Sequence, residues 1–253
     1  MGGDGIVVVK GGTIQPFALR MFNPDGSEFE RSGNGLRVLA AYLHDRARVR
    51  EAPFEVECGG DRIRMQVHSR TPEGSYDVEV EMGRARVGPA AVELDPAALD
   101  GLSRIAHPDA GRVAIVPVSV GNPHAVVFAD TVQGPFDADA WHRLAPGLAT
   151  HPAFAHGTNV QLVRAAPPRA IDILIWERGV GPTTASGTSA CATAVAAVSS
   201  GRIDPGEVEV RMEGGSFRVT VSRDLDVVLR GPVWEVGTGE LAEGFVRSLG
   251  APR

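Results

Sequence analysis

The chain carries the stretch SGNGLRVLAAYL at residues 32–43 and repeats its outline as SGTSACATAVAAV at residues 186–198. In each stretch a serine and then a glycine precede a run that predicts a helix, and serine is a preferred N-cap residue. The free N–H groups and the dipole of a helix N-terminus can hold an anion. The repeat therefore predicts two similar halves that each contribute one helix N-terminus to a single active site.

The two predicted helices differ in their surroundings. The first has one apolar stripe at helical spacing, formed by Leu36, Leu39 and Leu43, with Arg37 off that stripe. The second is small and apolar all round, which predicts a helix enclosed by sheet. We expect an α/β (α+β) fold of two pseudo-symmetric lobes, each a mostly antiparallel sheet wrapped around a central helix.

Most of both halves is predicted to be strand, because short alternating apolar and polar runs are separated by Gly and Pro. Pro24-Asp25-Gly26 and Gly59-Gly60-Asp61 predict the turns of antiparallel hairpins. Three further helices are expected at Asp95–Leu102, Asp137–Leu148 and Glu240–Leu249. The predicted strands are Ile6–Lys10, Phe17–Asn23, Phe54–Cys58, Arg62–Ser69, Tyr76–Met82, Val113–Ser119, Ala125–Ala129, Ile171–Glu177, Val208–Glu213, Phe217–Ser222, Leu225–Arg230 and Val233–Val236.

The length of 253 residues suits two lobes of common domain size. We expect an N-terminal lobe over residues 1–110 and a C-terminal lobe over residues 111–239. The segment 240–253 is expected to pack back on the N-terminal lobe.

The composition favours a soluble protein that binds small molecules. Hydrophobic residues make up 43% and charged residues 22% of the chain, and the net charge of −6 leaves no basic footprint for nucleic acid. Because no charged-then-apolar leader opens the chain and no apolar run could span a bilayer, we expect a cytoplasmic protein without membrane contact. Cys58 and Cys191 follow no metal-ligand or disulfide spacing and are expected to be buried thiols.

Ser32 and Ser186 are the first candidates for chemistry. Either serine alone reads as an ordinary N-cap. Their repetition, and polar side chains at strand ends and loops elsewhere, favour a site that holds the carboxylate and the ammonium of an amino acid. Each of those polar residues also has an ordinary reading, as a turn, a loop cap or a surface pair. They are Asn23, Asn122, Asn159, Glu177 and Arg178.

The sequence motifs of three other kinds of site are incomplete in this chain. The SGNG stretch lacks the third glycine of a dinucleotide loop, residues 181–187 lack the lysine of a P-loop, and Ser186 is not in a G-x-S-x-G elbow. His124 reads equally as a packed histidine and as a base.

Four segments together resemble the diaminopimelate epimerase family. They are RMFNPDGSEFERSGNGLRVLAAYL (20–43), VSVGNPHAVVF (118–128), HGTNV (156–160) and WERGVGPTTASGTSACATA (176–194). The resemblance implies two lobes with the active site in the cleft between them, and a homodimer. It also implies a two-base inversion of LL- to meso-diaminopimelate in the lysine and peptidoglycan pathway, without pyridoxal phosphate, metal or other cofactor.

Carried over by position, the resemblance makes Ser32 and Ser186 the catalytic pair. In the family both positions are cysteines, one removing the α-proton and the other returning a proton to the opposite face. The substrate contacts that it implies are Asn23, Gly33, Asn34, Asn122, Asn159, Glu177, Arg178, Gly187 and Thr188.

The change from thiol to alcohol is large. A free cysteine has a pKa near ~8.5 and bulk water, a stand-in for an alcohol, near ~15.7, a gap of roughly 10 kcal/mol. A helix N-terminus returns at most about 2 kcal/mol. No Lys or His lies close in sequence to either serine, and Cys191, five positions beyond Ser186, is expected on another face of the helix and one turn deeper.

Three explanations stay open. The pair acts on a more acidic proton or by elimination, as in a dehydratase (a lyase) of hydroxy amino acids; the protein is a non-catalytic amino-acid-binding homologue; or the cysteines were replaced deliberately. The matched serine pair favours a natural variant branch.

A second departure lies at the start of the chain. Family members carry a GLGND motif before the strand that matches Gly3–Val9, and the first lobe is therefore expected to lack a strand and a helix, leaving an open sheet edge. We expect a chain extended upstream to be more soluble or more stable than these 253 residues.

Overall fold

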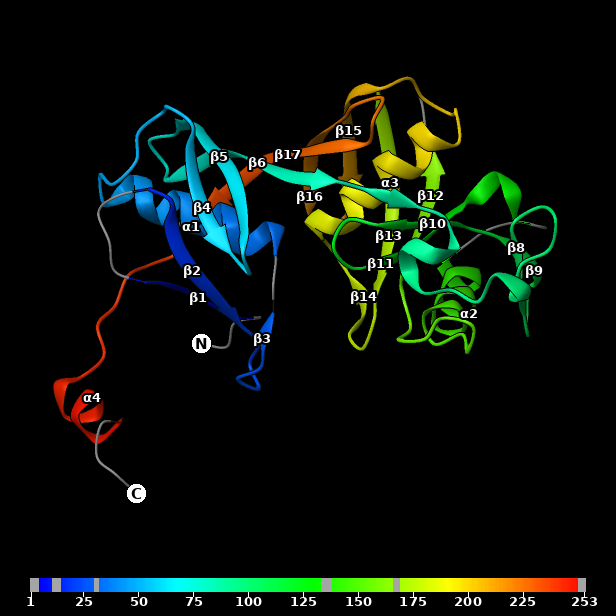
Figure 1. Ribbon diagram of the computed structural model, residues 1–253, viewed down its shortest axis with the longest axis horizontal. Helices are drawn as coiled ribbons and strands as arrows, with labels where there is room; N and C mark the ends of the chain where they lie inside the picture. The colour runs from blue at the N-terminus through cyan, green and yellow to red at the C-terminus, as the bar shows by residue number, and fades with distance from the viewer. Residues whose placement is uncertain (1–4, 11–14, 30–31, 133–137, 166–168, 250–253) are drawn as a thin grey trace.

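The chain folds into two lobes that lie side by side, joined by long strands (Figure 1). The computed structural model describes residues 5–10, 15–29, 32–132, 138–165 and 169–249. The α-helices are α1 (Gly33–Asp45), α2 (Ala138–Ala149), α3 (Gly187–Ser199) and α4 (Glu243–Leu249), and the 3₁₀ turns are η1 (Pro89–Val92), η2 (Pro96–Ala98) and η3 (Ala129–Thr131).

Strands dominate both lobes, as the sequence predicts. They are β1 (Ile6–Val9), β2 (Phe17–Phe22), β3 (Glu28–Phe29), β4 (Phe54–Cys58), β5 (Asp61–Arg70), β6 (Ser75–Arg84), β7 (Arg86–Val87), β8 (Arg104–His107), β9 (Gly111–Ala114), β10 (Val116–Ser119), β11 (Pro123–Phe128), β12 (Asn159–Ala165), β13 (Ala170–Glu177), β14 (Gly181–Thr183), β15 (Gly206–Met212), β16 (Gly215–Val221) and β17 (Asp226–Trp234).

One continuous sheet runs through both lobes in the order β1-β2-β4-β5-β6-β17-β16-β15-β13-β12-β11-β10-β7. The lobes join where β6 and β17 pair antiparallel, from Asp226 opposite Arg84 to Trp234 opposite Ser75. Most neighbouring pairs are antiparallel, with parallel exceptions at β2/β4, β11/β12 and β13/β15. The hairpin turns predicted between β2 and β3 and between β4 and β5 both join antiparallel strands.

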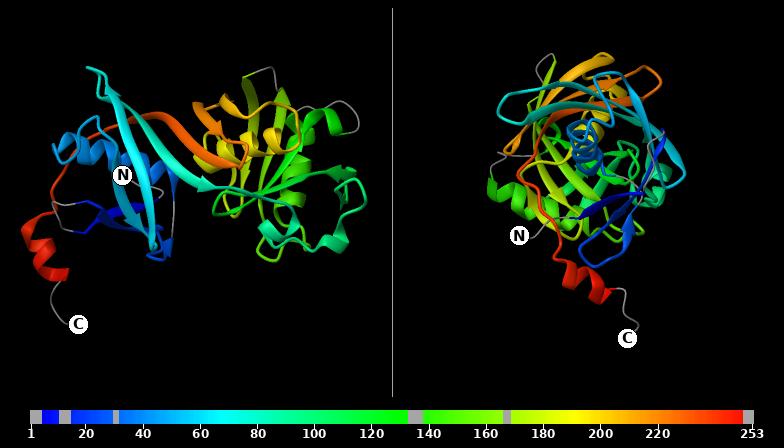
Figure 2. Two further views of the ribbon diagram at one scale, coloured as in Figure 1. Left: turned by 45° about the horizontal axis from the view of Figure 1, so that its top comes forward. Right: turned by 90° about the vertical axis from the view of Figure 1, so that its left-hand side faces the viewer.

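Each half of the sheet curves around one helix, and the end-on view of Figure 2 shows α1 surrounded by strands. Leu36, Leu39 and Leu43 of α1 are buried, and the helix contacts β5, β6 and β17. In α3 the small apolar residues from Ala190 to Ala197 are buried all round. The expected fold of two lobes with a central helix each is confirmed.

A further layer covers the outer face of the C-terminal lobe. Trp141, Leu144 and Leu148 of α2 share a second apolar cluster with Val92 and Ile105, which precede the predicted boundary at residue 110. Strand β7 also pairs with β10 of that lobe. We therefore propose a boundary near residue 85, because the chain from β7 onward packs with the C-terminal lobe.

Three predictions for individual elements differ from the structure. The single strand expected at Val113–Ser119 is divided at Ile115 between β9, which pairs with β8, and β10, which pairs with β11. The helix expected at Asp95–Leu102 is reduced to η2, since Leu99 is extended and forms an isolated bridge with Ile105. The strands expected on either side of Gly231-Pro232 are the single strand β17. Strand β16 pairs β17 only as far as Arg230, so Pro232 has one strand partner and its missing N–H costs no ladder bond on the other side.

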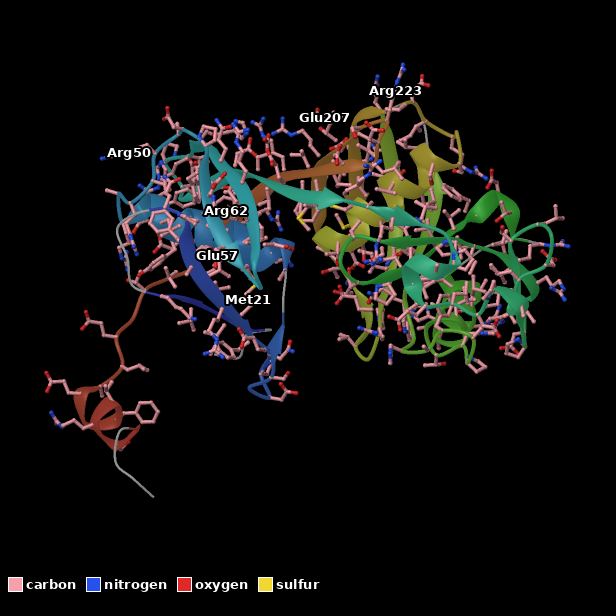
Figure 3. All side chains as sticks on the ribbon, viewed as in Figure 1. Met21, Arg50, Glu57, Arg62, Glu207 and Arg223 are labelled. Carbon is pink, nitrogen blue, oxygen red and sulfur yellow. The ribbon has the colours of Figure 1, made fainter. Side chains whose placement is uncertain are left out.

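The C-terminal segment does not pack back on the first lobe as predicted. Residues 235–248 are exposed, Leu241 and Phe245 among them, and Figure 3 shows the side chains of α4 standing apart from the lobe. Residues 237 and 239 before the helix are glycines, so the linker offers few side chains to anchor it. Residues 250–253 lie outside the described part. No helix in the described ranges is long and apolar enough to cross a membrane.

Candidate functional site

The N-terminus of α1 is built as the sequence predicts. Ser32 is its N-cap, and its Oγ accepts a hydrogen bond from the Gly35 N–H at 3.1 Å. Ser32 is half-buried and Asn34 is exposed. The first turn holds no acidic side chain, so the positive end of the helix dipole is not neutralised within the helix.

The N-terminus of α3 repeats this arrangement. Ser186 is the N-cap, is 5% exposed, and accepts from the Ser189 N–H at 3.5 Å. The Thr188 hydroxyl lies 3.5 Å from the Ser186 Oγ. This first turn is also free of acidic side chains. Both serines are therefore N-caps in the structure, and both helices present uncompensated N-termini.

The fold brings the two helix N-termini together against one side chain of β17. A Cβ on Gly33 would lie 3.0 Å from Leu229 Cδ2, and a Cβ on Gly187 would lie 2.9 Å from the same atom. The Cβ position of Gly187 is also 3.6 Å from Asn34 Oδ1, across the lobe boundary. Glycine at both positions lets the helix starts approach this closely.

Arg37 joins this junction, although it lies off the apolar stripe of its own helix. It is 5% exposed, with its guanidinium 4.2 Å from the ring centre of Phe217. The guanidinium donates to Asn34 Oδ1 at 2.6 Å and to the Pro232 carbonyl at 3.2 Å. Burial lowers the pKa of Arg37 to about 10, so the group stays charged at neutral pH. Arg37 thus fixes the Asn34 carboxamide oxygen and leaves its NH₂ group facing away.

In the C-terminal lobe, Asn159 ties two predicted segments together. Its Nδ2 donates to the Pro123 carbonyl at 2.9 Å, and its Oδ1 accepts from the Arg178 N–H at 2.9 Å. Glu177 ends β13 half-buried, and the exposed Arg178 side chain donates to the His156 carbonyl at 2.8 Å.

Asn122 lies beside this link and contacts His124. Its Oδ1 is 2.8 Å from the His124 Nε2. His124 is completely buried, and burial lowers its pKa to about 3. The ring is therefore neutral at pH 7 and packed inside the lobe, which favours the reading of His124 as a packed histidine.

Sequence reasoning missed Gln161 and Ser189, which are both completely buried. The Gln161 carboxamide lies 3.0 Å from the Ser189 Oγ. A signal was present, because Gln161 lies two positions after Asn159 in a strand and so shares its face.

Asn23 stands apart from the other predicted residues in its printed contacts. It follows β2, and its Nδ2 donates to the Ser27 Oγ at 3.0 Å within the β2–β3 turn. Among the remaining candidates, Asn159 is bonded to the main chain of Pro123 and Arg178, and the starts of α1 and α3 meet at Leu229.

Two open cavities of similar volume differ in whether they border the predicted site. One of about 630 Å³ is lined by β1 and by α1 residues that include Ser32 and Asn34, but by no residue of α3. Another of about 730 Å³ is lined by Asp77, Arg218 and Arg230 among others and includes none of the predicted site residues.

The cysteines are buried thiols, as predicted. Burial raises the pKa of Cys191 to about 12, so it offers no thiolate near Ser186 at neutral pH. Among the residues that the structure describes, no three His, Cys, Asp or Glu side chains form a metal-binding group.

Solved structures share this architecture. A probable proline racemase from Agrobacterium radiobacter K84 has a TM-score of 0.67 at 16% identity, covering 94% of this chain and 76% of that chain. A phenazine biosynthesis protein of the PhzF family from Bacillus anthracis has a TM-score of 0.63 at 15% identity, covering 91% and 82%. At these identities the likeness shows the fold alone.

Sequence relatives are closer. The family model for diaminopimelate epimerase matches residues 1–88 and 116–236. The diaminopimelate epimerase of Desulfitobacterium hafniense is 34% identical over 247 residues, covering 96% of this chain and 84% of the relative. That of Desulforudis audaxviator is 36% identical over 242 residues, covering 95% and 84%. With a family match in both lobes and this identity along nearly its whole length, the chain belongs to the diaminopimelate epimerase family.

Proposed function

We propose that this chain acts on diaminopimelate or a similar amino acid as an epimerase that needs no pyridoxal phosphate or metal, with Ser32 and Ser186 flanking the α-carbon. The observation that carries the proposal is the meeting of two capped, uncompensated helix N-termini at Leu229. Such a junction suits a carboxylate, because main-chain N–H groups and both helix dipoles attract negative charge there.

The caps leave specific donors for that carboxylate. In each helix the cap occupies the N–H of the third residue, at Gly35 and at Ser189. The N–H groups of the first two residues have no partner inside a helix. They belong to Gly33 and Asn34 in α1, and to Gly187 and Thr188 in α3.

In this proposal the C-terminal lobe binds the rest of the substrate. Diaminopimelate carries a second carboxylate and a second ammonium, and the guanidinium of Arg178 and the carboxylate of Glu177 match those charges. The carboxamides of Asn122 and Asn159 add neutral donors and acceptors beside them. Asn159 already makes two main-chain bonds, so it contributes only its second N–H or lone pair. We propose Asn23 as a further contact on the N-terminal lobe.

The serines set the chemistry. Each Oγ accepts a cap hydrogen bond, and the other Ser186 contact in the described residues is the hydroxyl of Thr188. Neither contact is a carboxylate, imidazole or amine that could take a serine proton. An epimerisation through these alcohols is therefore expected to be much slower than one through thiols. The same observation favours a second candidate, an amino-acid-binding homologue that keeps the cradle without turnover.

The experiment follows the α-proton of LL-diaminopimelate by NMR in deuterated buffer. It compares the natural chain, the double variant Ser32→Cys, Ser186→Cys, and the control Ser199→Cys, which makes the same change at the exposed far end of α3. Exchange by the natural chain supports the epimerase. Exchange by the double variant alone supports a diaminopimelate cradle with binding as its natural role. No exchange by either form, and no binding, would overturn both candidates.

A further inference from the structure

Two buried polar atoms next to Asn122 are left without partners in the described part of the chain. They are His124 Nδ1 and Gln161 Oε1. Both residues are completely buried, and the two side chains interact with each other. A buried polar atom without a partner costs about 1–3 kcal/mol, so two such atoms on contacting residues call for one explanation.

The protonation of His124 supplies the first step. A neutral imidazole has one N–H donor and one acceptor nitrogen. His124 Nε2 lies 2.8 Å from the Asn122 carboxamide oxygen, which can only accept, so Nε2 carries the proton. Nδ1 is then an acceptor and needs a donor.

Gln161 is the donor when its carboxamide is turned by 180°, which exchanges an oxygen and a nitrogen of nearly the same size. Its Nε2–H then donates to His124 Nδ1. In the structure Gln161 Nε2 donates to the Ser189 Oγ at 3.0 Å. After the turn, Oε1 takes this place and accepts a hydrogen bond from the Ser189 hydroxyl. Both unpartnered atoms gain a hydrogen bond in this single rearrangement.

If these hydrogen bonds ran in the opposite direction, the hydroxyl proton of Ser189 would have no acceptor among the described residues. If His124 Nδ1–H donated to Gln161, the Gln161 NH₂ would donate to Ser189, and the hydroxyl proton of Ser189 would need another acceptor. Gln161 is the only hydrogen-bond partner of the Ser189 Oγ within the described ranges. Asn122 would also have to turn its NH₂ inward, toward His124.

We propose that Ser189, Gln161 and His124 are positioning residues that form a one-way relay of hydrogen bonds and hold the NH₂ of Asn122 toward the ligand. The relay gives Asn122 the polarity of a donor, which suits a carboxylate of the substrate rather than its ammonium. This role rests on the proposed function, in which Asn122 contacts the substrate. The relay also begins in the first turn of α3, where the Ser189 N–H donates to the Oγ of the N-cap Ser186.

The first test needs no substrate. In protein labelled with ¹⁵N histidine, NMR correlation of the ring nitrogens with the ring protons shows which nitrogen carries the proton. We expect His124 to be protonated at Nε2. His107 is the internal reference, because its Nδ1 accepts from two main-chain N–H groups and its Nε2 faces the Leu144 carbonyl at 3.1 Å. A proton on Nδ1 of His124 in the natural chain would overturn the relay.

Variants test the direction of the hydrogen bonds in the relay and the role of the relay in substrate binding. In Gln161→Glu the carboxylate can only accept, so the proton of His124 is expected on Nδ1 while His107 stays unchanged. In Gln161→Leu and in the milder Ser189→Ala, the Kd for LL-diaminopimelate is expected to rise about tenfold for the former and less for the latter. Gln66→Leu is the matched control, since Gln66 makes one main-chain bond in the N-terminal lobe.

The outcomes separate the two proposals. An unchanged Kd in both Gln161→Leu and Ser189→Ala, with His124 protonated at Nε2, would overturn the positioning role. If the natural chain binds no diaminopimelate, the proposed function fails together with the role of the relay toward substrate, while the ring-proton measurement still decides its direction. If Gln161→Leu does not fold, the Ser189→Ala result decides.

Discussion

Gly33 and Gly187, the first residues of α1 and α3, face the same methyl carbon, Leu229 Cδ2, from the two lobes. Leu229 is completely buried in β17, the strand that pairs with β6 at the joint between the lobes. The relative placement of the two helix N-termini therefore depends on this apolar contact as well as on the polar residues around it. A change in size at this contact should move the two helix N-termini relative to each other.

Gly187→Ala tests that contact. The added Cβ would lie 2.9 Å from Leu229 Cδ2, so we expect the free energy of unfolding to fall by about 1–2 kcal/mol despite the better helix propensity of alanine. Leu229→Val makes room, and in the double variant the loss should be about 1 kcal/mol smaller than the sum of the single losses. Urea unfolding measures all three. Gly237→Ala, in open space, is the control, and strictly additive losses would contradict the contact.

Arg37→Lys tests the buried guanidinium. Lysine cannot reach Asn34 Oδ1 and the Pro232 carbonyl together, and it keeps a buried charge, so we expect a loss of about 2–4 kcal/mol in unfolding free energy. The control is Arg46→Lys at the exposed end of α1, expected to stay within about 0.5 kcal/mol. Urea unfolding measures both losses. Equal losses for the two substitutions would show that the contacts of Arg37 do not add to the free energy of unfolding.

Much of the fold is predictable from the sequence because its signals are local. A serine cap followed by glycine marks the start of both central helices within one residue, and Gly59-Gly60 marks a hairpin whose glycines both have positive φ. Predictions fail where distant packing decides. Arg37 lies off the apolar stripe of its own helix and is buried only because β16 and β17 cover that side.

For the candidate site, the sequence indicates polar residues at strand ends but not their contacts. Asn122, Asn159, Glu177 and Arg178 stand at strand ends, and the structure links three of them through main-chain bonds and His124. The contact of His124 with Gln161 depends on the parallel register of β11 and β12, in which Val126 lies opposite Gln161. Such a register between strands more than thirty residues apart has no local signal.

Thiol reactivity tests the two helix N-termini. Cys58 and Cys191 are buried, and the pKa of Cys191 is raised to about 12, so the natural folded chain should react with a thiol reagent only on unfolding. Ser32→Cys should add one fast-reacting thiol, because a helix N-terminus lowers the pKa of a half-exposed cysteine. Ser186→Cys should react more slowly, since Ser186 is 5% exposed. A Ser32→Cys thiol no faster than that of Ser199→Cys would contradict this account of α1.

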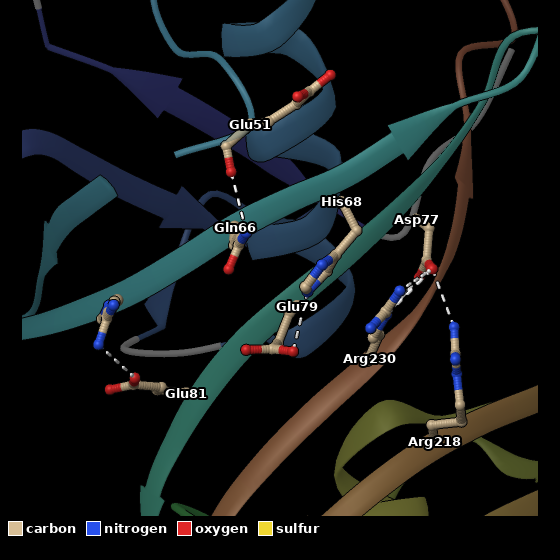
Figure 4. A network of polar contacts seen from close by, with 9 residues as sticks. Glu51, Gln66, His68, Asp77, Glu79, Glu81, Arg218 and Arg230 are labelled. Carbon is tan, nitrogen blue, oxygen red and sulfur yellow. Dashed lines mark hydrogen bonds and ion pairs between the residues drawn. The ribbon is translucent and has the colours of Figure 1, made fainter. Parts of the chain in front are cut away.

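Asp77 gives a pH-dependent prediction at the joint between the lobes. It accepts from Arg230 Nη2 at 2.7 Å and from Arg218 Nη2 at 2.9 Å, so that β6, β16 and β17 share one carboxylate (Figure 4). Burial by itself would raise the pKa of Asp77, but the bonds and charges of the two arginines outweigh it and leave the pKa below its usual 3.8.

The lowered pKa of Asp77 decides how its contribution to stability changes with pH. A carboxyl with a lower pKa in the folded state stabilises the fold fully above its unfolded pKa, near ~3.9, and loses this stabilisation as the pH falls through the folded value. Asp77→Asn should therefore lower the free energy of unfolding by about 1–2 kcal/mol at neutral pH. The difference from the natural chain should stay constant down to about pH 4 and shrink at lower pH.

Urea unfolding at several pH values measures this difference. Glu28→Gln is the matched control, because Glu28 pairs with Arg20 on the surface, where both side chains are nearly half exposed (46% and 45%), and its effect should stay within about 0.5 kcal/mol. A loss for Asp77→Asn that is as large at about pH 2.5 as at neutral pH would show that the carboxylate charge is not what joins the strands, because Asp77 is increasingly protonated as the pH falls to that level.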